Sequence, residues 1–469
     1  MYSRLAAVLR PADPADRDAG LSIVEMVVAF MVFALVTVGG MVAIATSLTL
    51  TSDNRAREVG ANLAAQEVDA VRSAADVFQV LDASTTTALN GTTYTVDRTV
   101  SWVSTTGLDS QCGAAGGALL YKRVNVAVTW PGMRASTPPV RADTVLAPNS
   151  KINDPAYGTI LVSVTSITGS GGTAGVTVTV KPSAVAGNKA VDLASQPAVT
   201  DAQGCSYALK VAPGTYDVTI SRTDAPHRDE KQAPVSTKVV GVAAGGSASA
   251  GFTYDRAGQF PMSYAVGFTG DRLLPADLSV SFLSTYPQYD AVGTDATRDL
   301  SPTSSGYQAI AGPYAPASAG AKSCLSVDPQ TWPTAADGAV GGRAPAAAAA
   351  PGTRSSTPLG VPMGVVRVKL AESVGFVRAK TATPIDDDPG CRGGLTYTFD
   401  VRTANKKATG NVVDLALPFG SWTFTTGTSA NAIGLPVAYT ALTPLTRGRS
   451  HFDLTLSFNA VLLDPRRAP

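Results

Sequence analysis

The stretch that decides the fold runs from Gly20 to Leu50 and reads GLSIVEMVVAFMVFALVTVGGMVAIATSLTL. It is apolar along almost its whole length and contains one carboxylate, Glu25, five residues after Gly20. As a helix it would extend about 45 Å at 1.5 Å per residue, which exceeds the roughly 30 Å hydrocarbon layer of a membrane. Residues 21–50 are therefore predicted to form a transmembrane helix.

The twenty residues before this stretch, MYSRLAAVLRPADPADRDAG, are mostly polar. A secretory signal peptide has the opposite order, because its apolar region precedes the cleavage site. A carboxyl group in lipid is costly unless a partner compensates for it. Glu25 is therefore a candidate functional residue.

The run from Gly20 to Met26, GLSIVEM, followed by a long apolar helix, resembles the processing site of type IV prepilins and pseudopilins. In that superfamily a prepilin peptidase cleaves after the glycine, and the new N-terminal residue is often methylated. The glutamate pairs with the terminal amine of a neighbouring subunit. The resemblance gives these roles to Gly20, Leu21 and Glu25. Two departures are that Leu21 replaces the more frequent Phe or Met, and that acidic residues balance the basic ones in the leader. The alternative is an ordinary single-span anchor.

The chain after the apolar run is predicted to remain helical through residues 53–77 and then to form strands at 92–103, 119–130 and 140–146. The paired glycines Gly39 and Gly40 either allow local unwinding or permit close helix packing. Alternation places Val124, Val126 and Val128 on one face of a strand. The expected fold of residues 21–147 is α+β, a long N-terminal helix on an antiparallel sheet, and its resemblance to minor pilins covers about residues 1–147.

The rest of the chain predicts all-β sandwich domains, because short strands alternate with Gly/Pro turns. We expect a β-sandwich at 148–254, a β module at 255–340, a low-complexity linker at 341–358 and a second sandwich at 359–469. The run 212–218, APGTYDV, resembles the turn and strand of transthyretin-like and collagen-adhesin B-type domains, which would place Tyr216 in the core. The run 417–424, LPFGSWTF, repeats that pattern.

Four cysteines lie far apart in the sequence, at positions 112, 205, 324 and 391. Their spacing disfavours a zinc site. Outside the cytoplasm an even number of cysteines is compatible with two disulfides, and four residues permit three pairings. Proximity favours Cys112 with Cys205 and Cys324 with Cys391, although four unpaired thiols remain an alternative.

Composition excludes several functions. The net charge of +1 provides no field for nucleic acid, and two histidines are too few for histidine-based catalysis. No recognisable catalytic or nucleotide-binding motif is present, so neither an enzyme nor a cofactor or metal site is expected. The carboxylates at 386–388 are interpreted as a solvated turn in preference to a calcium loop, and the charged run 227–231 as a solvated loop.

The resulting hypothesis is a minor type IV pilin-like subunit with a β-sandwich head for structural or adhesive contacts. Its partners would be the prepilin peptidase, other pilin subunits and the pilus assembly machinery, the membrane and a surface receptor. It would lie in the cytoplasmic membrane as a single-pass protein before assembly, and at the cell surface in a pilus afterwards. The alternatives are a membrane-anchored adhesin that never assembles, a pseudopilin of a secretion or DNA-uptake system, and a surface hydrolase.

Overall fold

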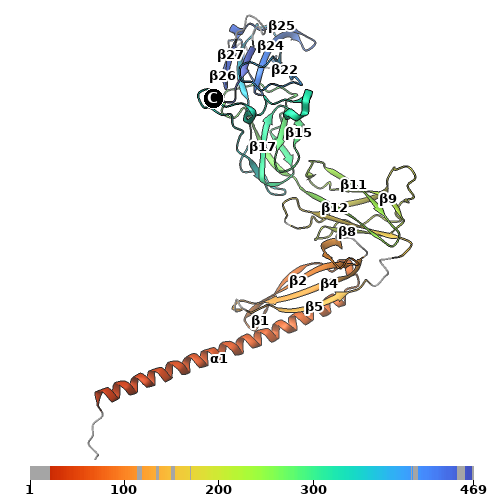
Figure 1. The fold of residues 1–469 in the computed structure, drawn as a ribbon, viewed down its shortest axis with the longest axis vertical. Coiled ribbons are helices and arrows are strands. Elements are labelled where there is room, and N and C mark those ends of the chain that lie inside the picture. Colours follow the sequence, from red (N-terminus) through yellow and green to blue (C-terminus); the bar gives the residue numbers. More distant parts are fainter. Residues whose placement is uncertain are drawn as a thin grey trace, which may run out of the picture. The chain divides into compact units, whose positions relative to one another are not determined.

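The computed structural model describes residues 22–113, 119–133, 137–148, 154–169, 171–402, 404, 410–451 and 460–466. One long N-terminal helix is followed by many β-sheets (Figure 1). The chain divides into two compact units. The first contains residues up to Val100 together with Lys122–Ala147, and the second contains Ser101–Tyr121 and the chain from Pro148 onward.

The first unit begins with α1, Ile23–Arg72, a single helix of 50 residues. The helix is continuous through Gly39 and Gly40, and apart from the adjoining residues and the backbone of the helix itself, nothing described lies within 4 Å of where a Cβ would stand at either glycine. It ends with Ser73 as its C-cap, followed by the 3-10 helix η2, Val77–Gln79. The helix therefore extends far beyond the apolar stretch, as the sequence predicts.

The C-terminal part of α1 packs on a sheet in the order β1-β2-β4-β5, with the short β3 paired to β2. The β1–β2, β2–β3 and β4–β5 pairs are antiparallel. The strands are β1 (Ala83–Leu89), β2 (Thr92–Ser104), β3 (Asp109–Ser110), β4 (Leu119–Thr129) and β5 (Val140–Leu146). Val124, Val126 and Val128 of β4 are fully buried in a core with Ala64 and Val68 of α1. The alternation in the sequence thus identified the face of β4 that packs inward.

The second unit contains a β-sandwich of two sheets, in the orders β10-β12-β6-β8 and β11-β9-β7. Its strands are β6 (Gly158–Thr165), β7 (Thr177–Pro182), β8 (Cys205–Val211), β9 (Gly214–Ser221), β10 (His227–Asp229), β11 (Val235–Val242) and β12 (Ser247–Arg256). Tyr216 is fully buried, as predicted, and its hydroxyl donates to the carbonyl of Ala212 at 3.0 Å. Gly214 has a φ of +156° and lies against Ala190, so no side chain fits there.

Residues 101–121 also belong to the second unit and are held to this sandwich. A disulfide joins Cys112, in the 3-10 helix η3 (Gln111–Gly113), to Cys205 at the start of β8. The indole Nε1 of Trp102 donates to the hydroxyl of Tyr207 at 3.0 Å. Burial raises the pKa of the Tyr207 hydroxyl well above its usual range.

The next module consists of sheets in the orders β16-β13-β19 and β15-β14-β17-β18. Its strands are β13 (Gly258–Tyr264), β14 (Ser279–Leu283), β15 (Tyr289–Val292), β16 (Thr297–Leu300), β17 (Thr303–Ala311), β18 (Ala347–Ala349) and β19 (Leu359–Val361). The 3-10 helices η4 (Ala317–Lys322) and η5 (Pro329–Thr331) follow β17.

The segment 341–358 is not a free linker, which corrects the prediction from composition. Ala347–Ala349 form β18, which pairs with β17 and buries Ala347 and Ala349. Alanine side chains are small enough to pack closely beside β17. An alanine-rich composition is equally typical of a flexible spacer, so composition alone does not predict a buried strand here. Residues from 260 to 463 share one hydrophobic core, so the modules on either side of residue 358 are packed against each other.

The C-terminal sandwich has sheets in the orders β23-β20-β26 and β22-β21-β24-β28-β27, with β25 paired to β24. Its strands are β20 (Gly364–Lys369), β21 (Phe376–Thr381), β22 (Thr396–Asp400), β23 (Val412–Leu417), β24 (Gly420–Ser429), β25 (Ala432–Pro436), β26 (Leu442–Thr446), β27 (Gly448–His451) and β28 (Ala460–Leu463), and η6 spans Tyr439–Ala441. Trp422 is fully buried and donates to the carbonyl of Pro418 at 2.9 Å. Trp422 and Tyr216 thus each donate a hydrogen bond to the carbonyl of the residue four positions earlier.

Candidate functional site

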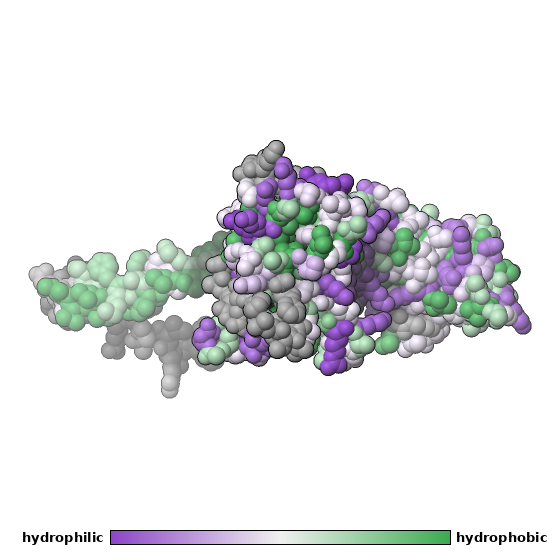
Figure 2. Space-filling view, turned by 90° about the horizontal axis from the view of Figure 1, so that it is seen from above, coloured by the Kyte–Doolittle hydropathy of each residue, from purple (hydrophilic) through white to green (hydrophobic). Residues whose placement is uncertain are grey.

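The N-terminal half of α1 is the candidate functional site, because its surface is apolar on all sides. Every residue from 22 to 50 is exposed except Thr37, which is half-buried. By length and composition the helix is suited to cross a membrane. Figure 2 shows hydrophobic residues along the helix, whereas hydrophobic and hydrophilic residues are mixed over the β modules. Such a surface is stable only in an apolar surrounding such as lipid or other apolar helices.

Ser22 and Glu25 start the helix with a capping box. Ser22 is the N-cap in extended conformation, and its hydroxyl accepts from the backbone N–H of Val24 at 3.3 Å. The Glu25 carboxylate accepts from the backbone N–H of Ser22 at 3.2 Å. A carboxylate in the first turn also interacts favourably with the helix dipole. Glu25 is recognisable in the sequence as a lone carboxylate, and its capping role is recognisable from the Ser-x-x-Glu spacing, a signal missed in the prediction.

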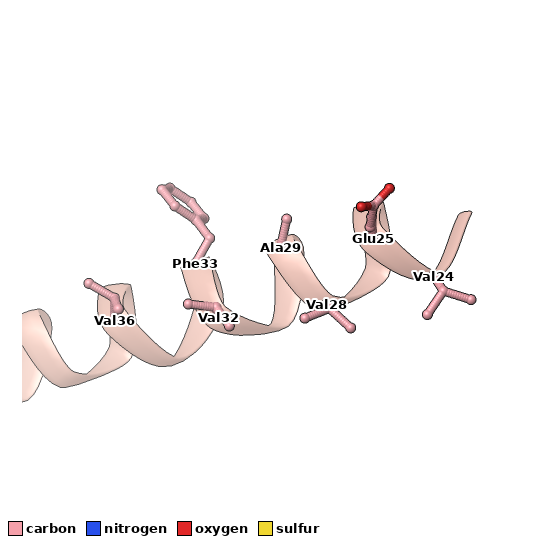
Figure 3. A pocket seen from close by; sticks show the side chains of 7 residues that line it. All are labelled: Val24, Glu25, Val28, Ala29, Val32, Phe33 and Val36. Atoms are coloured by element: carbon pink, nitrogen blue, oxygen red, sulfur yellow. The ribbon is translucent and has the colours of Figure 1, made fainter. Parts of the chain in front are cut away.

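Glu25 stands at the end of a hollow on one side of the helix (Figure 3). Glu25, Ala29 and Phe33 project to the same side at intervals of four residues. The hollow has a volume of about 610 Å³ and is lined by Val24, Glu25, Val28, Ala29, Val32, Phe33 and Val36. The only charged group in this lining is the Glu25 carboxylate. Among these lining residues, only Glu25 could pair with a cation.

Gly20 and Leu21, the two predicted processing residues, lie outside the described residues. Their roles stay predictions. The first described residue after them, Ser22, has φ −65° and ψ 138°, so the helix begins just downstream of the predicted cleavage point.

The four cysteines form two disulfides, Cys112–Cys205 and Cys324–Cys391, the two pairs that proximity in the sequence favours. Each joins segments that were predicted to belong to different domains. The second disulfide lies beside a short backbone pairing in which Leu325 donates to the carbonyl of Gly390 at 2.9 Å.

The carboxylates at 386–388 do not form a solvated turn throughout. Asp388 is buried and accepts hydrogen bonds from the hydroxyls of Ser326 at 2.5 Å and Ser421 at 2.6 Å. Asp387 pairs with Arg466 at 3.0 Å. Asp388 therefore serves as an internal hydrogen-bond acceptor, whereas Asp386 and Asp387 are exposed. Within the described part of the chain, no group of three or more His, Cys, Asp or Glu side chains could hold a metal ion.

The charged run 227–231 is also only partly solvated, contrary to the prediction. His227 is buried, and its ring stacks on Tyr254 with centroids 5.5 Å apart. Its Nδ1 lies 2.8 Å from the carbonyl oxygen of Ala225. The sequence pattern missed this because β10 pairs with β12, a strand that follows much later in the chain.

A cleft that the sequence did not predict lies between the 268–273 loop and β23. It has a volume of about 700 Å³, and its polar lining includes Arg272, Arg367 and Asp414. Arg367 and Asp414 bind each other through two hydrogen bonds of 2.7 and 2.9 Å. Arg367 and Asp414 lie directly opposite each other in the β20–β23 ladder, so the first role of this ion pair is to stabilise the sheet.

Comparisons with known proteins give only distant similarities. No family model and no curated protein matches the chain. Among solved structures, the Bacillus anthracis TIE protein is 11% identical with a TM-score of 0.20, over 76% of this chain and 70% of that protein. BcpA, the major pilin subunit of Bacillus cereus, is 8% identical with a TM-score of 0.18, over 65% of this chain and 95% of that chain. A variant of BcpA gives the same identity and TM-score over 59% and 90%. TM-scores this low carry no argument about fold or function.

Proposed function

We propose that this chain is a minor type IV pilin-like subunit, processed by a prepilin peptidase and assembled into a surface pilus through its N-terminal helix. The observation that carries the proposal is α1 itself. It has an exposed, all-round apolar half with one carboxylate near its start, and a second half packed on a sheet. In an isolated span this carboxylate would serve only as a helix cap and would be costly in lipid, whereas a cationic partner would compensate for its charge.

In this proposal, cleavage after Gly20 frees the amine of Leu21, and Glu25 of one subunit pairs with the terminal amine of its neighbour. The capping box holds the carboxylate at the helix start, where a neighbouring amine would replace or join the N–H of Ser22. Pairing offsets the desolvation of both charges, and it occurs in only one axial register. Assembly through Glu25 would thus set the spacing between subunits.

The β modules then serve as a head for structural or adhesive contacts, with a surface receptor as one partner. Their bulk would crowd a lattice in which every subunit bore them, which favours a rare position such as the tip. The protein would lie in the cytoplasmic membrane before assembly, together with the assembly machinery and other pilin subunits, and at the cell surface afterwards.

Processing is tested by Gly20→Ala, with Gly39→Ala as the matched control on the same helix. Mass spectrometry of the mature N-terminus should find cleavage before Leu21 in the wild type and the control, and an intact leader in Gly20→Ala. Normal cleavage in Gly20→Ala would contradict prepilin processing, and an intact leader in the wild type would favour a plain anchor.

Assembly is tested by comparing Glu25→Val and Glu25→Gln with the wild type in sheared surface filaments and in the membrane fraction. Both variants should be inserted and processed, yet their share in filaments should fall at least tenfold because neither carries the negative charge that would form an ion pair with an ammonium group. Equal partition of all three proteins would leave Glu25 without a role in assembly and favour the membrane-anchored adhesin that never assembles.

A further inference from the structure

The first sandwich and the module after it are joined without a linker. β12 ends at Arg256 and β13 begins at Gly258, so only Ala257 separates strands that belong to sheets of two different modules. Ala257 is buried, and its N–H donates to the carbonyl of Pro226 at 2.8 Å. Boundaries between independently moving domains normally fall in exposed, polar linkers with few contacts. This joint, which lies within the second compact unit, has the opposite character.

A loop of the sandwich also reaches into the following module. Residues 229–233 form the turn between β10 and β11, and the Asp229 carboxylate accepts from the N–H groups of Lys231 and Ala233, each at 2.8 Å. The turn presents Gln232, which has a φ of +66° and is only 5% exposed. The loop is therefore held by hydrogen bonds within the turn, and its glutamine is buried despite the charged residues around it.

Both polar atoms of the Gln232 side-chain amide form hydrogen bonds with groups of the next module. Its Nε2 donates to the hydroxyl of Tyr307 at 2.8 Å, and its Oε1 accepts from the backbone N–H of Ser301 at 2.7 Å. The Ser301 hydroxyl in turn donates to the carbonyl of Asp229. The hydroxyl of Tyr307 donates to the carbonyl of Ser301 at 3.0 Å, which completes the network.

The receiving side is itself fixed by packing. Ser301 and Tyr307 are almost completely buried, and the Tyr307 ring meets Phe260 of β13 edge to face with centroids 5.4 Å apart. Burial raises the pKa of Tyr307 to about 12, so its hydroxyl stays protonated and able to donate. Apolar contacts tolerate sliding, but buried directional hydrogen bonds are satisfied in one arrangement only.

We propose that Gln232 is a latch that locks the first sandwich to the following module, so that the two move as one body. A force applied to the later modules, or a displacement caused by a partner bound there, is then transmitted to the sandwich because no hinge lies between them. This inference is independent of the pilus assignment, because it depends only on contacts inside the second unit.

The test measures the spread of distances across the joint in the full-length protein. Spin labels are introduced through noncanonical residues at Val239 of β11 and Val292 of β15, both well exposed, which leaves the disulfides intact. Pulsed dipolar spectroscopy should give one narrow distribution for the wild type. Gln232→Ala should broaden it at least twofold, whereas Gln259→Ala, an exposed glutamine on β13, should leave it narrow.

Tyr307→Phe provides a second variant that keeps the ring on Phe260 and removes only the hydroxyl. It should broaden the distribution as Gln232→Ala does, and it decides the matter if Gln232→Ala fails to fold. A broad distribution in the wild type, or an unchanged narrow one in folded latch variants, would overturn the proposal.

Discussion

The two halves of α1 form one continuous helix that suits two different surroundings. From Ile23 to Leu50 nearly every side chain is exposed, with Phe33 and Leu35 at 69% and 68%. In the second half one stripe is buried, made of Gly60, Ala64, Val68 and Val71. The backbone is the same, so the difference lies in the side-chain pattern alone. An apolar surface on all sides requires an apolar solvent, whereas a single apolar stripe requires a sheet to cover it.

The largest effect is expected when the same substitution, Val→Asp, is made in each half of α1. Val68→Asp puts a carboxylate into the core under the sheet and should destabilise the first unit by about 4 kcal/mol. Val38→Asp should leave that core intact but make membrane insertion less favourable by about 3 kcal/mol. Hydrogen exchange of β4 reports on the first effect, and the protein's distribution between membrane and soluble fractions reports on the second. If both variants changed the same measurement, the contrast between the halves would be wrong.

A smaller effect is expected from the glycines. A Cβ at Gly60 would lie 3.2 Å from the ring of Trp130, so Gly60→Val should overpack the core and destabilise the unit by about 1–3 kcal/mol. Gly39→Val meets nothing within 4 Å and should change the melting temperature little. Thermal unfolding of both variants in detergent micelles checks this. Equal melting temperatures would mean that Gly60 does not pack as closely as described.

The smallest expected effect is on the pH dependence of stability, and it comes from a carboxyl group that is buried, unlike the exposed one of Glu25. Asp255 is buried in the first sandwich and accepts from the Ser166 hydroxyl and the Ile167 N–H, both at 2.7 Å. Desolvation raises the pKa of Asp255 above its ordinary value of 3.8. The folded state therefore binds the proton of the Asp255 carboxyl more tightly than the unfolded state does. The stability of the folded state falls as the pH rises from about 3.8 through the pKa that Asp255 has in the folded state.

Asp255→Asn keeps an acceptor oxygen and removes the titration, so its stability relative to the wild type should increase with pH over this window. Denaturant unfolding at several pH values measures the difference. Asp192→Asn, at an exposed position in the same sandwich, is the control for the loss of one carboxylate. A constant difference between Asp255→Asn and the wild type would show that burial does not shift this carboxyl.

The sequence alone predicted the elements whose pattern is local. The apolar run, the helix beyond it and the buried face of β4 follow from short-range periodicity. The burial of Tyr216 follows from the resemblance of its turn and strand to known β-sandwich domains, and the run around Trp422 repeats that pattern. Helical and strand periodicities are fixed by the backbone, so a few residues are enough to recognise them. Glu25 could be identified as a candidate for the same reason, because one carboxylate in an apolar run is visible without any partner.

Only the tertiary structure decided which polar or small residues become buried. Gln232, His227 and Asp388 lie in polar stretches, and their partners come from strands and loops far away in the sequence. The alanines of β18 are buried for the same reason, since β17 supplies the missing strand. A polar or small side chain carries no local signal of its burial, because the cost or gain depends on groups that only the folded chain brings within hydrogen-bonding or packing distance.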